Sequence, residues 1–159
     1  MHPLTHKLRK VTSFNINKLY KYNFLVLLLT AIGYFAYVGL TSLMQGKPLT
    51  DILHDSPYTS VMLMVVFLNI LVGYWFWLNK DYALRNTGTV RLIFITLTIC
   101  QLALGNLLVV MTSGLTFFNA IQQVPDGKAE RSLTSYAIVG VAASYVICVG
   151  LILLVLSRS

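Results

Sequence analysis

The chain has 159 residues, of which 57% are hydrophobic and 11% charged, and its mean hydropathy is +0.73. Soluble domains average roughly 45–50% apolar and 25% charged residues, so a water-soluble fold of this size could not bury so much apolar surface. The formal net charge of +7 would suggest nucleic-acid binding in a soluble protein. Here the basic residues flank apolar runs, so we expect the lipid bilayer as a partner and no nucleic acid.

The first 22 residues form a basic segment without acidic residues, which we assign to the cytoplasm. Its cationic side chains are expected to contact anionic headgroups of the inner leaflet, each contributing on the order of 1 kcal/mol. They are Lys7, Arg9, Lys10, Lys18 and Lys21. The apolar residues between them are compatible with a short interfacial helix and equally with a disordered tail.

Four apolar runs follow, each close to the about 20 residues that cross the ~30 Å hydrocarbon core at 1.5 Å per residue. They occupy residues 23–44, 58–78, 90–111 and 133–156. Two outer loops at 45–57 and 112–132, an inner loop at 79–89 and a tail at 157–159 complete the chain. Short connections make consecutive helices antiparallel neighbours. We therefore predict an all-α, up-down-up-down bundle of four transmembrane helices, forming one domain over 23–156. A cleaved signal peptide fits the first run poorly, because the run exceeds the roughly 7–15 residues of such a segment.

Basic residues are divided unequally between the two sides of this arrangement. Nine lie on the side of the N-terminal segment, and three, Lys47, Lys128 and Arg131, lie on the other. Short loops rich in lysine and arginine stay in the cytoplasm, so we predict that both chain ends are cytoplasmic (N-in/C-in). The abundance of leucine, tyrosine, asparagine and lysine has a bacterial character, and we expect a multi-pass protein of a bacterial plasma membrane.

Two segments of the predicted outer loops have helical character. Residues 48–55 are expected to form one or two helical turns, and the apolar residues of 115–124 suggest a helix resting on the outer leaflet. Within the first segment, Asp51, His54 and Asp55 have the i, i+3, i+4 spacing that could present one face to a metal ion. Such a cluster is more often a solvated helical turn, so we expect no metal site.

The central parts of the predicted spans contain no Asp, Glu, Lys, Arg or His. Ion-coupled transporters usually need such a group, so we do not expect coupled transport. The mildly polar residues are candidates for helix packing, which we favour, or for lining a pore: Thr30, Asn69, Thr98, Gln101 and Asn106. In one continuous helix Gln101 and Asn106 are about 140° apart. We therefore expect one of them, Asn106, to meet a second chain.

Small residues recur at helical spacing in the same segments, and such residues let helix backbones approach closely. We predict helix-contact faces at Gly33, Gly73, Gly105, Gly140, Ser144 and Cys148. Cys100 and Cys148 could form a redox pair if they lay at equal depth. Buried thiols usually act as small packing residues, and we expect that role here.

The sequence contains no phosphate-binding glycine loop and no motif of a protease, hydrolase or metalloenzyme. We therefore do not expect an enzyme or a cofactor. The stripes of small residues favour a non-catalytic accessory, immunity or assembly subunit that acts through helix contacts with another membrane protein or with copies of itself. The first alternative is an oligomeric channel or solute facilitator lined by Asn69 and Gln101. The second is a membrane sensor or lipid-interacting protein.

Overall fold

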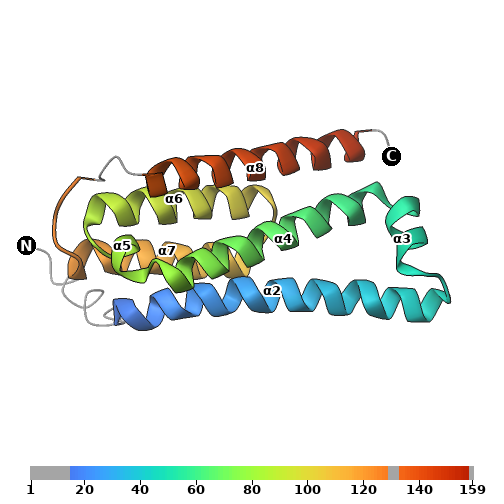
Figure 1. Cartoon of the computed structure of the whole chain (residues 1–159), viewed down its shortest axis with the longest axis horizontal. Helices are drawn as coiled ribbons and strands as arrows, with labels where there is room; N and C mark the ends of the chain where they lie inside the picture. The colour runs from blue at the N-terminus through green and yellow to red at the C-terminus, as the bar shows by residue number, and fades with distance from the viewer. Residues whose placement is uncertain (1–14, 129–132, 158–159) are drawn as a thin grey trace, which may run out of the picture.

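The computed structural model describes residues 15–128 and 133–157, with backbone alone for 133–135. Over these residues the chain is all-α, as predicted, and forms seven helices. They are α2 (Ile16–Gln45), α3 (Leu49–Asp55), α4 (Pro57–Leu78), α5 (Lys80–Ala83), α6 (Thr87–Ala103), α7 (Leu107–Gln123) and α8 (Leu133–Leu156). Figure 1 shows α2, α4, α6, α7 and α8 lying roughly along one axis, with α3 across it at one end.

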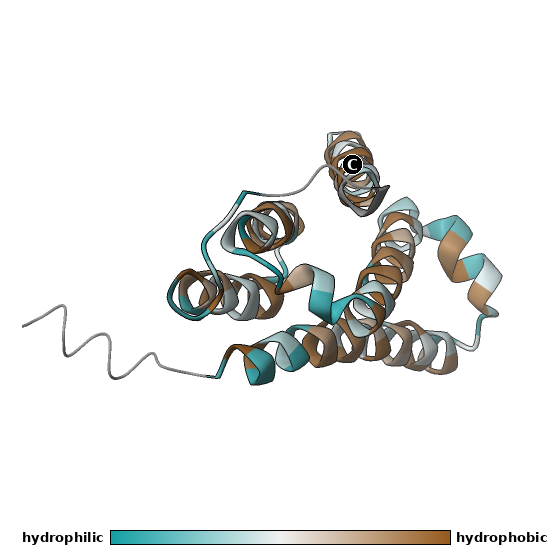
Figure 2. Ribbon diagram, turned by 60° about the vertical axis from the view of Figure 1, so that its left-hand side comes forward, coloured by the Kyte–Doolittle hydropathy of each residue, from teal (hydrophilic) through white to brown (hydrophobic). Residues whose placement is uncertain are grey.

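Three of these helices, α2, α4 and α8, are long and apolar enough to cross a membrane. They contain 30, 22 and 24 residues. At 1.5 Å per residue they are about 45, 33 and 36 Å long, which exceeds the ~30 Å hydrocarbon core. Hydrophobic residues dominate these helices, whereas hydrophilic residues gather at the start of α2 and at α5 (Figure 2). The chain therefore has the composition and helix lengths of a multi-pass membrane protein.

 

The helix predicted over 90–111 is wrong, because the chain breaks there into two helices. The φ of Gly105 is 74°, which lies in the left-handed region that favours glycine. The Gly105 N–H donates to the Leu102 carbonyl and the Asn106 N–H donates to the Gln101 carbonyl, a pair of bonds that ends α6. The side chain of Asn106 then accepts from the Val109 N–H and begins α7. A glycine and an asparagine therefore end one helix and start the next within three residues.

The two 17-residue helices α6 and α7 form an antiparallel hairpin whose turn lies beside the middle of α4 (Figure 1). The loop after α7 returns to the start of α6, where the Thr87 N–H donates to the Pro125 carbonyl (3.0 Å) and the Gly88 N–H donates to the Gly127 carbonyl (2.9 Å). Residues 115–123, expected to form a separate surface helix, are part of the longer helix α7, which packs against α2 and α6. The short helix expected at 48–55 is present as α3.

The hairpin changes the order in which the chain runs along the axis. Helix α2 runs from one end to the other, α4 returns, α6 and α7 go halfway and come back, and α8 runs forward again (Figure 1). The end of α8 therefore lies at the same end of the long axis as α3, opposite the start of α2 (Figure 1). This order differs from the predicted four-helix up-down-up-down bundle, in which both chain ends share one side.

We name the two ends by their contents. The end at which α2 begins holds six of the described basic residues and is called the basic end: Lys18, Lys21, Lys80, Arg85, Arg91 and Lys128. The opposite end, called the α3 end, holds Lys47. The predicted headgroup contacts of Lys7, Arg9 and Lys10 lie outside the described residues.

An aromatic cluster joins three helices near the basic end. The ring centroids of Tyr20 and Phe76 are 5.3 Å apart, and those of Phe76 and Phe94 are 5.5 Å apart. The Tyr20 hydroxyl donates to the Phe76 carbonyl at 2.8 Å, so its polar group is satisfied inside the core. Helices α2, α4 and α6 are thereby held together, while α8 packs mainly on α4.

Candidate functional site

Four polar side chains from four helices meet inside the bundle, and we call them the central polar cluster. Asn69 Oδ1 accepts hydrogen bonds from Gln101 Nε2 (2.8 Å) and from the Tyr145 hydroxyl (2.7 Å). Gln101 Oε1 accepts from Asn106 Nδ2 at 2.9 Å. Asn69, Gln101 and Tyr145 are at most 3% exposed. The cluster therefore links α4, α6, α7 and α8 through buried hydrogen bonds.

The position of the cluster follows from the hairpin. Asn69 lies about midway along α4, and Tyr145 lies about midway along α8. Gln101 and Asn106 flank the turn between α6 and α7, so the turn reaches the same depth. Irregular backbone at membrane depth is tolerated only where protein or a cavity surrounds it. The side chains of the central polar cluster surround the irregular backbone of the hairpin turn in this way.

Gln101 and Asn106 bond to each other, so the expectation that they could not share one interior is wrong. The 140° separation applies to a continuous helix, and the helix is broken between them. Tyr145 was not predicted as a site residue. Its signal in the sequence is a tyrosine midway along a helix whose neighbouring residues are small or aliphatic, because a buried tyrosine hydroxyl usually has a partner.

The chemistry of the cluster is suited to holding helices together. Amide side chains are not acid-base catalysts at physiological pH, and Asn69 Oδ1 already accepts two hydrogen bonds. Hydrogen bonds between membrane helices contribute about 0.6–2 kcal/mol each. The three bonds of the cluster therefore fix the hairpin turn against α4 and α8.

A second set of polar contacts holds the hairpin against α2 and closes it on itself. Asn23 Nδ2 donates to the Leu19 carbonyl (3.0 Å), and it also lies within bonding distance of the Thr112 carbonyl and of Thr116 Oγ1. Between the hairpin helices, Thr98 Oγ1 lies 2.8 Å from Ser113 Oγ. Thr98 therefore connects the two helices of the hairpin.

A cavity of about 200 Å³ reaches the central polar cluster from the α3 side. Its walls include Thr30, Tyr34 and Asn69, and its floor includes Gly105 and Asn106 of the hairpin turn. The Thr30 hydroxyl donates to the Leu27 carbonyl of its own helix, and the Tyr34 hydroxyl donates to the Thr59 carbonyl. The cavity places Thr30, Asn69 and Asn106 around one space, whereas Gln101 does not line it.

The predicted small-residue faces divide into two groups. Gly73 lies at a helix contact inside the bundle, because a β-carbon there would be 3.6 Å from the Phe24 ring. Gly105 forms the hairpin turn. Gly33 and Gly140 have open space around them, and Ser144 donates only to the Gly140 carbonyl of its own helix. The second group therefore faces away from the described chain.

The two cysteines, Cys100 and Cys148, are free and buried. Both contribute to the packing near Tyr145 at the middle depth of the bundle. Neither forms a disulfide bond, so the structure places them among the packing residues of the core.

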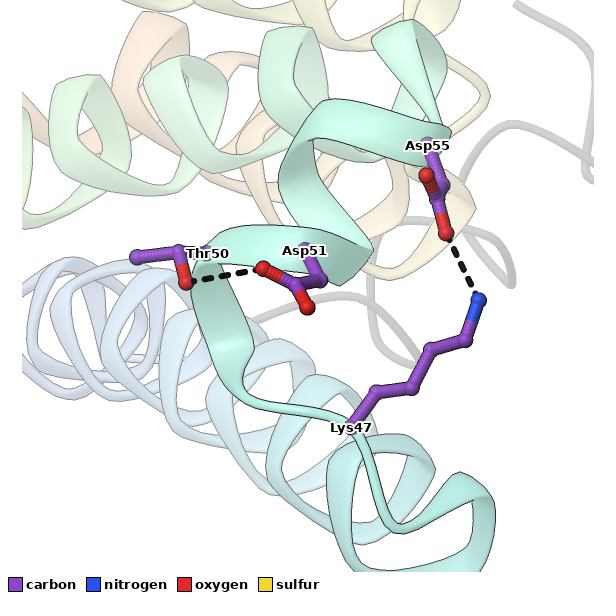
Figure 3. Close-up of polar contacts among 4 residues, drawn as sticks. All are labelled: Lys47, Thr50, Asp51 and Asp55. Carbon is purple, nitrogen blue, oxygen red and sulfur yellow. Dashed lines mark hydrogen bonds and ion pairs between the residues drawn. The ribbon is translucent and has the colours of Figure 1, made fainter.

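The polar segment at the α3 end is arranged around an ion pair (Figure 3). Lys47 Nζ lies 2.8 Å from Asp55 Oδ2, while the Thr50 hydroxyl donates to Asp51 Oδ1 at 3.3 Å. The hydrogen bond and the charge of Lys47 lower the pKa of Asp55, and Asp55 in turn raises the pKa of Lys47. Across the described residues no group of three His, Cys, Asp or Glu side chains could hold a metal ion.

No protein-family model, curated protein or solved structure matches the chain.

Proposed function

We propose that the chain is a non-catalytic subunit of a bacterial plasma membrane that supports, protects or assembles another membrane protein through helix contacts. The observation that carries this proposal is the group of small residues that face away from the bundle. Gly140 and Ser144 form a small-xxx-small pair on α8, the pattern with which membrane helices approach one another closely. Within the described chain nothing occupies the space over Gly140.

Helix α8 is the most available of the long helices. It packs mainly against α4 through a face that contains Tyr145 and Cys148, which are 1% and 5% exposed. Its opposite face carries Gly140 and the exposed residues Ile147 and Leu154. A partner helix could pack against this face without any change in the contacts that hold the bundle together.

We further propose that the chain crosses the membrane three times, through α2, α4 and α8, and enters it once with the α6–α7 hairpin. Six of the described basic residues lie at the basic end, against one at the α3 end. The excess of lysine and arginine favours a cytoplasmic basic end. The end of α8 is then outside the cell.

The test is affinity purification of the tagged chain from its native membrane in mild detergent, followed by subunit and mass analysis. We expect a stoichiometric membrane-protein partner. Gly140→Leu and Ser144→Leu should release it, because a leucine side chain prevents close approach of the backbones. Val146→Leu is the matched control, since Val146 is also exposed on α8 but lies more than a quarter turn away from both positions. Recovery of a free monomer in every mild detergent would contradict the proposal.

The cavity beside the central polar cluster favours a second candidate, an oligomeric channel or solute facilitator. Asn69 and Asn106 are the polar groups that a solute entering from the α3 end would meet. The test is flux of ions and small solutes into liposomes that contain the chain, compared with the Asn69→Leu and Gln101→Leu variants. Identical flux in all three would exclude this candidate, whereas a homo-oligomer with altered flux would favour it over a subunit.

A further inference from the structure

An apolar groove runs along the outside of the bundle between α4, α6 and α8. Its volume is about 340 Å³, within the roughly 300–1,000 Å³ of ligand-binding pockets. Helix α8 packs mainly against α4 and only lightly against α6, which leaves the groove open between them. Its walls are apolar side chains that include Leu71, Trp75, Ile93, Leu97, Val141 and Ala142. An apolar space of this kind does not hold ordered water.

The length of the groove indicates what it can hold. On α4 it extends from Leu71 to Leu78, and on α8 it extends from Ala137 to Tyr145. These lengths correspond to roughly 10–12 Å, from the middle depth marked by Tyr145 to the end of α4. The groove therefore spans one half of a bilayer whose hydrocarbon core is about 30 Å thick. A transmembrane helix of a partner would need a contact surface through both halves, whereas a lipid acyl chain occupies one leaflet.

The charge at the mouth of the groove indicates which lipid fits. The groove ends at the basic end, where Lys80 begins α5 two residues after Leu78. Lys128 is exposed at the same end. The basic end as a whole carries its six basic residues against two described carboxylates, Asp81 and Asp126. The resulting net charge of +4 attracts an anionic headgroup to this end.

We propose that this groove binds one acyl chain of an anionic glycerophospholipid from the leaflet at the basic end, with the phosphate headgroup beside Lys80. The proposal is independent of the proposed subunit function, because it concerns the side of α8 that faces α4 and α6. The lipid fills the space that the light packing of α6 against α8 leaves open.

The two tryptophans of the chain provide the measurement. Trp75 lines the groove, while Trp77 is 67% exposed. In a Trp77→Phe variant of the full chain, reconstituted into phosphatidylcholine vesicles, fluorescence quenching by lipids with brominated acyl chains reports occupancy beside Trp75. We expect brominated phosphatidylglycerol to occupy the site about fivefold more strongly than brominated phosphatidylcholine at equal mole fraction.

Two substitutions separate the acyl-chain contact from the headgroup contact. Ala142→Leu fills the groove and should abolish the preferential quenching, whereas Ala143→Leu, one residue further and about 100° around the helix, should retain it. Lys80→Gln lies outside the apolar core and should remove the preference for phosphatidylglycerol while quenching persists. Equal quenching by the two lipids in the parent protein would overturn the proposal, because it indicates ordinary surrounding lipid. Absence of quenching by both would also overturn it, because the groove would then be closed to lipid.

Discussion

Replacing Asn69 by leucine should lower the free energy of unfolding, by an amount that follows from the hydrogen bonds of the central polar cluster. The substitution removes the acceptor shared by Gln101 Nε2 and the Tyr145 hydroxyl, which lie 2.8 and 2.7 Å from Asn69 Oδ1. Each hydrogen bond between membrane helices contributes about 0.6–2 kcal/mol, so the loss of two should lower the free energy of unfolding by about 1–4 kcal/mol.

A double-mutant cycle tests whether the two donors depend on Asn69. Tyr145→Phe alone loses one bond and should lower the free energy of unfolding by about 0.6–2 kcal/mol. In the Asn69→Leu background the same substitution should have almost no further effect, because the hydroxyl has already lost its partner.

The assay is unfolding of the detergent-solubilised chain by increasing sodium dodecyl sulfate, followed by tryptophan fluorescence. Thr30→Val is the control, because the Thr30 hydroxyl donates to a carbonyl of its own helix and should change stability little. Additive effects of Asn69→Leu and Tyr145→Phe would refute the shared-acceptor arrangement. An unchanged stability of Asn69→Leu would refute the role of the cluster.

Two further predictions concern the hairpin turn and the α3 end. Gly105→Ala should lower the free energy of unfolding by about 1 kcal/mol, because the φ of 74° disfavours any β-carbon. Gly33→Ala is the control and should not lower it, because Gly33 lies in a helix with open space around it. Equal effects of the two substitutions in the same unfolding assay would contradict the left-handed turn at Gly105. Lys47→Met should raise the pKa of Asp55 toward its ordinary value in an NMR titration, and an unchanged pKa would argue against the ion pair. Because Lys47 lowers the pKa of Asp55, stabilisation by the pair is present at neutral pH and is lost as the pH falls through that lowered pKa.

The long helices could be predicted from hydropathy, but the hairpin could not. The helices expected at 58–78 and 133–156 coincide with α4 and α8 because continuous apolar runs of that length have few other solutions in a membrane protein. The run at 90–111 has the same hydropathy, yet it contains Gly105 followed by Asn106. Glycine is common within membrane helices, so Gly105 was interpreted as a packing residue.

The candidate site was predicted by residue type but not by arrangement. Asn69, Gln101 and Asn106 were recognised as polar groups in an apolar setting, and that environment favours bonds between helices. Their common location depends on the turn of the hairpin, which brings Asn106 back toward Gln101. Tyr145 reaches Asn69 from a residue 76 positions along the chain, a contact that local sequence patterns do not encode.

The hairpin is tested most directly by determining on which side of the membrane the residues after it lie. In a chain with Cys100 and Cys148 replaced by alanine, single cysteines at Lys128 and Ser157 are treated in intact cells with a membrane-impermeant maleimide. Lys18→Cys and Lys47→Cys serve as inner and outer controls. A hairpin that returns to the cytoplasm predicts labelling at Ser157 and protection at Lys128. Labelling at Lys128 with protection at Ser157 would show instead that residues 90–111 cross the membrane as one helix.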